Sequence, residues 1–399
     1  MEYSKNYKIE ILTPLCIASN QKYKEPEFMI DNKKVKFLNI EKIIAEKPEI
    51  IEDLFAQHMS NMKHKDKFDI NKHSHFIKYT LDFYNSYDFS DEIYGFIKTT
   101  GKAYIPGSSL KGAFILNFLK NKDNANLYLE KLKQSFKESE SSRQQKTFKY
   151  TDVEKINRET EKIILGEPNT NLFKFLSFTD GNPLDCESNL KIASVKVFSI
   201  NQKNSQFVIQ WFAGVIKSKE GQRYARYVTY PKEGKSILVE TLAPKKVVYG
   251  KYKFMLPSQV VQNFGDCFPW VKKQNFTSFS NILQQIRKNI ARRIESEINF
   301  IAQIKNKLSG DLSIINSYLR HFENLKTMNQ NLKDNEIILQ MGLLTGFISK
   351  TLIDHDIELP VHIKKLRYKD YRIFPKTRRI IINNNNVETL GWIKVTFDQ

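Results

Sequence analysis

The residues best suited to chemistry form a short segment, Ile105-Pro106-Gly107-Ser108-Ser109-Leu110-Lys111-Gly112. Its glycines let the backbone approach a ligand closely, and a helix that begins here would present unpaired N–H groups beside the ammonium of Lys111. These are the components of a phosphate site, so Gly107, Ser108, Ser109 and Lys111 are its candidate contacts. The spacing fits neither a Walker A loop nor a nucleophile elbow. A tight turn into a helix capped by Ser108 or Ser109 would explain the same residues.

A second segment, from Gln340 to Thr351, again combines glycines, hydroxyls and one lysine. We expect a helix over 337–353 with a break at the glycines, and Gly342, Gly346 and Lys350 as further anion contacts.

The segment from Val361 to Ile380 has eight basic residues against one acid, Asp370. Aromatic residues alternate with them, a composition that suits single-stranded nucleic acid because cations follow phosphates while rings stack on bases. A solvated charge run is the alternative interpretation. Lys376, Arg378 and Arg379 are the candidate contacts at its end; the other members are Lys364, Lys365, Arg367, Lys369, Arg372, Tyr368, Tyr371 and Phe374.

A catalytic alternative rests on histidines and one aspartate. His73 and His75 could place two imidazoles on one face of a strand, as an acid/base pair or as half of a metal site, and Asp180 follows an expected strand. Exposed histidines and a simple Asp-Gly turn are the competing interpretation. Because no cysteine or glutamate has metal-ligand spacing beside them, we expect no catalytic residue, no metal and no cofactor.

Composition favours a nucleic-acid partner. The 399 residues include 63 Lys+Arg against 44 Asp+Glu, a formal net charge of +19, and this excess destabilises the chain unless a polyanion neutralises it. Three widely spaced cysteines and the lack of a signal peptide or an apolar span predict a protein of the reducing cytoplasm that does not enter a membrane.

Hydrophobic periodicity predicts an α+β chain whose first half is dominated by strands. A polar helical stretch is expected over 40–87, a helix from residue 108 or 109, and an excursion from the fold over 135–160. Isoleucines spaced three or four apart over 282–301 predict one long helix with a core-facing stripe, followed by a helix over 312–325. The expected strands are 7–12, the hairpin 28–38, 92–98, 172–178, 190–200, 207–216, 237–242, 380–382 and 392–397.

The opening segment Leu12-Thr13-Pro14-Leu15-Cys16-Ile17-Ala18-Ser19, the hairpin 28–38 and the segment 105–112 together resemble the RAMP superfamily of CRISPR–Cas proteins. The order of the later segments is similar to the family of the fifth subunit of type III-A effector (Csm) complexes. These segments are 175–180, 240–242, 342–350, Phe374-Pro375-Lys376-Thr377-Arg378-Arg379 and 390–395.

The resemblance implies an RRM-like, ferredoxin-type RAMP core with insertions and a second, degenerate, helix-rich RAMP-like half. The implied segments are an N-terminal domain over 1–235, with helical insertions at about 40–90 and 123–165, and a C-terminal domain over 236–399, with a helical region over 275–355. It also implies a non-catalytic subunit that binds CRISPR RNA (crRNA), caps the backbone filament at the crRNA 3′ end and supports crRNA maturation. Its implied partners are crRNA, the adjacent backbone RAMP subunit, the small subunit and host 3′-trimming nucleases. A RAMP-family endoribonuclease that uses His73, His75 or a metal bound by Asp180 is the alternative.

Overall fold

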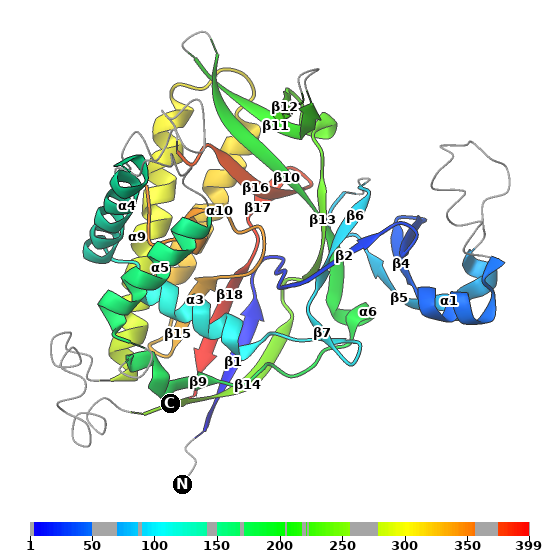
Figure 1. Cartoon of the computed structure of the whole chain (residues 1–399), viewed down its shortest axis with the longest axis horizontal. Helices are drawn as coiled ribbons and strands as arrows, with labels where there is room; N and C mark the ends of the chain where they lie inside the picture. Colours follow the sequence, from blue (N-terminus) through cyan, green and yellow to red (C-terminus); the bar gives the residue numbers. More distant parts are fainter. Residues whose placement is uncertain are drawn as a thin grey trace.

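The protein folds into two large β-sheets with helices packed on one side, as the computed structural model shows (Figure 1). The structure describes residues 4–49, 70–86, 90–141, 150–167, 171–203, 206–217, 221, 223–255, 278–355 and 374–398. Among these residues, no helix is long and apolar enough to cross a membrane.

Strand β1 lies at the centre of a five-stranded antiparallel sheet, called sheet A here, with the order β15-β18-β1-β14-β9. Tyr7, Ile9 and Ile11 of β1 are buried while Lys8 between them is exposed, so one face of the sheet meets the core and the other faces solvent. The strands are β1 (Lys5–Ile11), β9 (Leu176–Phe178), β14 (Val247–Phe254), β15 (Glu336–Gln340) and β18 (Trp392–Phe397).

Helices α3 (Gly107–Leu119), α9 (Phe279–Lys305) and α10 (Ser313–Gln330) cover the buried side. The isoleucine stripe of α9 is core, as predicted: five of its members are at most 1% exposed. Ser278 caps the helix, because its hydroxyl accepts a hydrogen bond from the Asn281 N–H at 3.2 Å. The buried stripe members are Ile282, Ile286, Ile290, Ile294 and Ile301.

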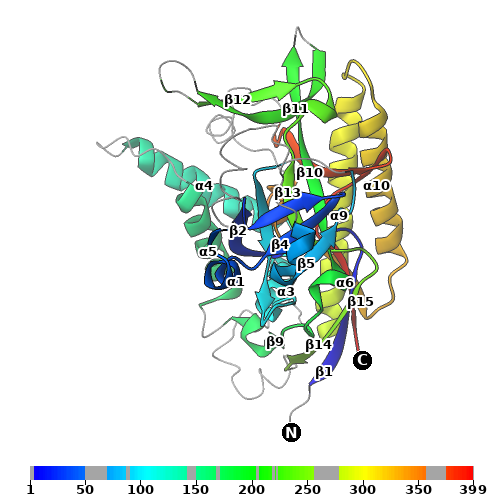
Figure 2. The same ribbon diagram turned by 90° about the vertical axis from the view of Figure 1, so that its right-hand side faces the viewer.

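The second large sheet, sheet B, has eight strands in the order β12-β11-β10-β13-β6-β2, with β16 and β17 added beside β10. Only the β13–β6 pair is parallel within the described part of this sheet. The β11–β12 ribbon lies at the end of the molecule opposite the chain termini (Figures 1 and 2). The strands are β2 (Ala18–Lys24), β6 (Glu92–Phe96), β10 (Leu190–Lys203), β11 (Gln206–Lys217), β12 (Arg223–Val228), β13 (Ile237–Leu242), β16 (Thr377–Asn383) and β17 (Asn386–Glu388).

A small lobe beside sheet B contains the predicted hairpin (Figure 1). Strands β3 (Phe28–Asp31) and β4 (Lys34–Leu38) join through Asn32 and Lys33, both with positive φ, as a two-residue hairpin turn requires. Strand β5 (Ile77–Asp82) completes this three-stranded sheet, which helix α1 (Ile40–Glu46) adjoins. The helical prediction over 40–87 is therefore correct for α1 and wrong for β5.

The remaining elements are short apart from a helical pair. Helices α4 (Lys122–Ser141) and α5 (Tyr150–Leu165) pack on each other. Together they cover most of the segment 123–165, whose role as an insertion stays a prediction. The short elements are α6 (Cys186–Asn189), β7 (Lys98–Thr99), β8 (Lys102–Ala103) and the 3₁₀ turns η1 (Ile70–Phe76), η2 (Leu172–Phe175), η3 (Pro231–Glu233) and η4 (Ile348–Lys350).

The second half differs from its prediction at one place. The segment 337–353, expected to be helical, begins as the buried strand β15 and continues as a loop with one 3₁₀ turn, so the helical region 275–355 ends before β15. Each of the two large sheets contains strands from before and after residue 235. In sheet A, for example, β1 lies between β14 and β18. The boundary at 235/236 stays a prediction.

Candidate nucleic-acid interface

The N-terminus of α3 carries the first predicted anion contacts, but an internal carboxylate already binds there. The Gly107 N–H donates a hydrogen bond to Oδ1 of Asp180 at 2.8 Å. Pro106 is the residue that precedes the helix, and its side chain makes no capping bond, so Ser108 and Ser109 lie in the first turn and do not cap it. The capping prediction is wrong, and Asp180 supplies the negative charge that a helix N-terminus favours.

Gly107 is required for close packing and not for ligand access. A Cβ atom at this position would lie 2.3 Å from the Phe178 carbonyl oxygen and 2.6 Å from that of Thr179. The backbone of α3 therefore contacts the end of β9 directly, which a side chain would prevent.

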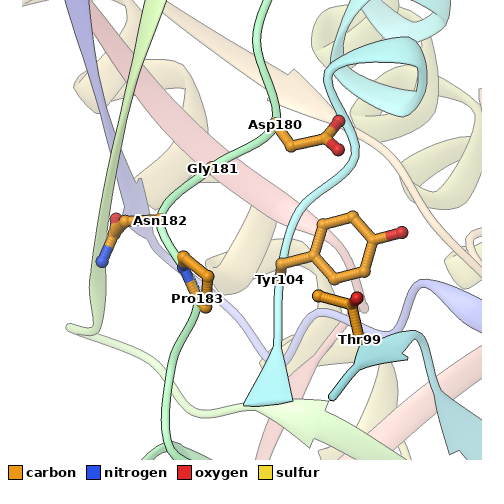
Figure 3. Close-up of a pocket in the computed structure, with 6 residues that line it drawn as sticks. All are labelled: Thr99, Tyr104, Asp180, Gly181, Asn182 and Pro183. Atoms are coloured by element: carbon orange, nitrogen blue, oxygen red, sulfur yellow. The ribbon is translucent and has the colours of Figure 1, made fainter. Parts of the chain in front are cut away.

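Asp180 also lines a surface pocket of about 310 Å³ next to α3 (Figure 3). The carboxylate points toward the side of the segment on which Tyr104 and Thr99 lie, while Asn182 points the other way. An exposed carboxylate repels phosphate, so this pocket is a poor phosphate site. The predicted contacts that stay accessible here are Ser108, which is exposed, and the half-buried Ser109 and Lys111.

The ammonium of Lys111 remains a suitable candidate for binding an anion. Its ammonium has no ion-pair partner among the described residues. Burial lowers the pKa of Lys111, and a bound phosphate would oppose that effect by favouring the charged amine.

The second glycine segment is a loop that packs on the opening segment Leu12–Ser19. Gly342 has φ +96°, and a Cβ there would lie 2.3 Å from the Cys16 carbonyl oxygen, which accepts a hydrogen bond from the Leu343 N–H at 2.7 Å. The loop hydroxyls bind within the loop, since Ser349 donates to Thr345 Oγ1 at 2.7 Å. With η4 only three residues long, the predicted helix N-terminus is absent from this loop.

Lys350 and Arg379, predicted separately, lie near each other in space. Lys350 is exposed, whereas Arg379 on β16 is half-buried. Although part of the Lys350 side chain is exposed, the protein around its ammonium partly excludes water and lowers the pKa of Lys350, and the positive charge of Arg379 lowers it further. Two cations that destabilise each other form an electrostatic site that an anion would stabilise.

Lys376 immediately precedes β16, the strand that carries Arg379. Its ammonium donates to Asn201 Oδ1 at 3.1 Å and lies 5.7 Å from the ring centroid of Tyr227. It is half-buried, so part of its side chain reaches the surface. The basic residues 364–372 and Tyr368 and Tyr371 lie outside the described residues.

Arg378 is not a surface cation. It is 8% exposed, and its Nε donates to Oε1 of Glu297 at 2.7 Å while Nη1 donates to the Pro375 carbonyl at 2.6 Å. Tyr318 and His355 bind the same carboxylate. The prediction that Arg378 contacts RNA is wrong in this structure, because the guanidinium is enclosed in a buried ionic cluster.

The histidine pair does not lie on a strand, as the catalytic alternative expected. His73 and His75 lie on the 3₁₀ turn η1, not on a strand, with ring centroids 6.2 Å apart. His75 lies 3.8 Å from Glu46 at the surface. Within the described ranges, no three His, Cys, Asp or Glu residues are grouped as metal ligands would be.

Sequence reasoning missed one surface that carries candidate functional residues, the outward face of β14. The run Val247-Val248-Tyr249-Gly250-Lys251-Tyr252-Lys253-Phe254 alternates in exposure, and this period of two was the available signal.

The chain belongs to the RAMP superfamily, whose family model matches residues 8–336. Its fold is similar to a chain from a cryo-EM structure of a Csm–crRNA–target RNA ternary complex in a type III-A CRISPR–Cas system. That pair has 16% identity and a TM-score of 0.57, covering 99% of this chain and 100% of the other. It is also similar to the crystal structure of T. onnurineus Csm5, with 14% identity and a TM-score of 0.55, covering 97% of this chain and 99% of the other. At these identities the likeness establishes the fold, α+β and RAMP-like, as predicted. A search of curated proteins found no match.

Proposed function

We propose that this chain is a non-catalytic crRNA-binding subunit of a type III-A CRISPR effector complex, acting in the cytoplasm. In this role it corresponds to the fifth Csm subunit, which caps the backbone filament at the crRNA 3′ end and supports crRNA maturation. Membership of the RAMP superfamily and the end-to-end fold likeness to Csm chains support the assignment. Its proposed partners are crRNA, the adjacent backbone RAMP subunit, the small subunit and host 3′-trimming nucleases.

The observation that carries the proposal is the pair Lys350 and Arg379. Partial exclusion of water lowers the pKa of Lys350, and the positive charge of Arg379 lowers it further. A phosphate bound beside both cations would attract each of them and offset their repulsion. The proposed contacts are therefore Lys350 and Arg379, with Lys376 just before β16 and Lys111, Ser108 and Ser109 on α3. Gly107, Gly342 and Gly346 shape the backbone around them.

The decisive experiment replaces the two cations in the assembled complex. Lys350→Ala with Arg379→Ala should weaken single-stranded RNA binding and reduce the slope of log affinity against log salt by about 0.7 for each phosphate that the variant no longer neutralises. Lys326→Ala with Lys42→Ala is the matched control, because both lysines already lie near carboxylates, 3.4 Å from Glu295 and 3.8 Å from Glu46. Equal salt slopes in the two double variants would contradict the assignment.

A second measurement concerns the 3′ end. Complexes assembled without this subunit should carry crRNA with longer and more heterogeneous 3′ ends than complete complexes, which sequencing of the extracted RNA would show. Unchanged 3′ ends would exclude the capping and maturation role while leaving RNA binding intact.

The rival activity, endoribonuclease cleavage by His73, His75 or Asp180, is tested on the same preparation. Repeat RNA incubated with the protein, with and without Mg²⁺, should stay uncut. Cleavage that disappears in His73→Ala or Asp180→Asn would establish the rival.

A further inference from the structure

The outward face of sheet A presents an exposed aromatic ring among lysines. Tyr249 on β14 is 56% exposed and lies directly opposite the exposed Lys8 of β1 in the strand register. Lys251 and Lys253 follow on the same face, since alternate residues of a strand point the same way, and both are exposed. We call these four residues the Tyr249 face.

The cations of this face are not neutralised by neighbouring groups. Within the described part of the chain, the ammonium groups of Lys8, Lys251 and Lys253 have no ion-pair or hydrogen-bond partner. The nearest carboxylate on the same face of β1 is that of Glu10, which is engaged 3.3 Å from Lys394. The face therefore has a local excess of positive charge beside a solvent-exposed ring.

We propose that the Tyr249 face is a second single-stranded RNA surface, on which a base stacks on Tyr249 while Lys8 and Lys251 contact the flanking phosphates. The proposal rests on the crRNA-binding function proposed above. Directly opposed side chains have Cβ atoms about 5 Å apart, and residues two apart along a strand are separated by roughly 7 Å. A ring with cations at these separations matches one base with the phosphates beside it.

Two polar side chains of this face that could read base identity are already engaged. The side-chain amide of Asn6 is engaged with Asp398 at 2.8 Å, and Glu10 is paired with Lys394. Stacking on tyrosine and contact between lysine and phosphate accept any base, because every base has a π-face. The Tyr249 face thus suits a guide whose sequence varies, whereas the acidic pocket at Asp180 does not suit an RNA backbone.

The test compares three variants of the full chain by fluorescence anisotropy of labelled oligo(A) and oligo(U) RNA. Tyr249→Thr, which keeps a strand-favouring residue, should weaken binding of both RNAs by about 5- to 150-fold, the range expected when one base can no longer stack. Tyr249→Phe should stay within about twofold of wild type. Tyr230→Thr is the matched control, since this tyrosine is 64% exposed elsewhere on the surface.

An RNA oligomer with 2-aminopurine gives an independent readout, because stacking quenches its fluorescence. Quenching by wild type and Tyr249→Phe but not by Tyr249→Thr would support the proposal. Wild-type binding that is unaltered in Tyr249→Thr, yet abolished in the Lys350/Arg379 double variant, would overturn this surface alone. A wild-type chain that binds neither RNA would overturn the proposed function together with it.

Discussion

Replacing Arg378 by methionine should destabilise the fold and should not remove an RNA contact. Methionine retains the apolar stem but leaves the Glu297 carboxylate, 5% exposed, without its cationic partner. Removing one member of a buried ion pair costs about 3–5 kcal/mol, because the remaining charge is left in a poorly solvating environment. The loss should be near the upper end of this range, since the guanidinium contacts both oxygens, at 2.7 Å and 3.3 Å.

The destabilisation should depend on pH in a definite direction. Arg378 and His355 hold the pKa of Glu297 well below its ordinary value, so the pair stabilises the fold above the unfolded pKa of about 4.3 and loses this effect as the pH falls. In Arg378→Met, burial acts on Glu297 without the main opposing charge and raises its pKa. The difference in stability between wild type and variant should therefore shrink between pH 7 and pH 4.

Equilibrium urea unfolding of the full chain at several pH values measures this difference. Arg379→Met is the matched control, because the next residue on β16 lies on the opposite face and is half-buried; we expect it to cost about 1 kcal/mol or less. A loss under about 1 kcal/mol in Arg378→Met, accompanied by weaker RNA binding, would refute the buried-cluster argument. It would restore Arg378 as an RNA contact.

Two further predictions concern α3 and the residue that follows it. Gly107→Ala should destabilise the protein by about 1–3 kcal/mol, because the added Cβ meets the Phe178 carbonyl. Gly112 is open to solvent on the same helix, so Gly112→Ala should increase the free energy of unfolding by up to about 1 kcal/mol. Equal shifts of the thermal midpoint in the two variants would exclude the close-packing argument. Burial lowers the pKa of Lys120 to about 7, so the unfolded chain binds the extra proton above that pH and wild-type stability should rise toward pH 10. The rise should reach at most about 1.4 kcal/mol per pH unit. Lys120→Met should lack it, and parallel pH profiles of the two proteins in denaturant would contradict the assignment.

Individual helices and strands were predictable where hydrophobic residues in the sequence recur with a clear helical or strand period. The isoleucine stripe of α9 and the hairpin 28–38 have strong periods of about 3.6 and of 2, and both are confirmed. Strand β15 was missed because Ile337-Ile338-Leu339 is buried on both faces, and a continuous apolar run fits a buried helix as well as a buried strand. Sequence period alone could not separate these cases.

The glycines of the candidate site show a different limit. Gly107 and Gly342 both follow the expectation that glycine permits close approach, but the approaching group is backbone of the same chain in each case. A glycine beside a helix start looks the same whether the neighbour is a phosphate or a carbonyl. Only the tertiary position of Asp180 and Cys16 decides between them.

The adjacent residues Arg378 and Arg379 show how the alternation of a strand divides a basic motif into two roles. Successive side chains of β16 point to opposite faces, so one arginine of the pair had to face the core once the segment formed a central strand beside β10. The buried arginine requires a buried carboxylate, and Glu297 on α9 provides it. The outward arginine lies near Lys350, and its charge lowers the pKa of that lysine. Burying this pair removes one positive and one negative charge together, so the net +19 of the chain is unchanged. Strand alternation concentrates the outward charge where it directs a cation outward beside another.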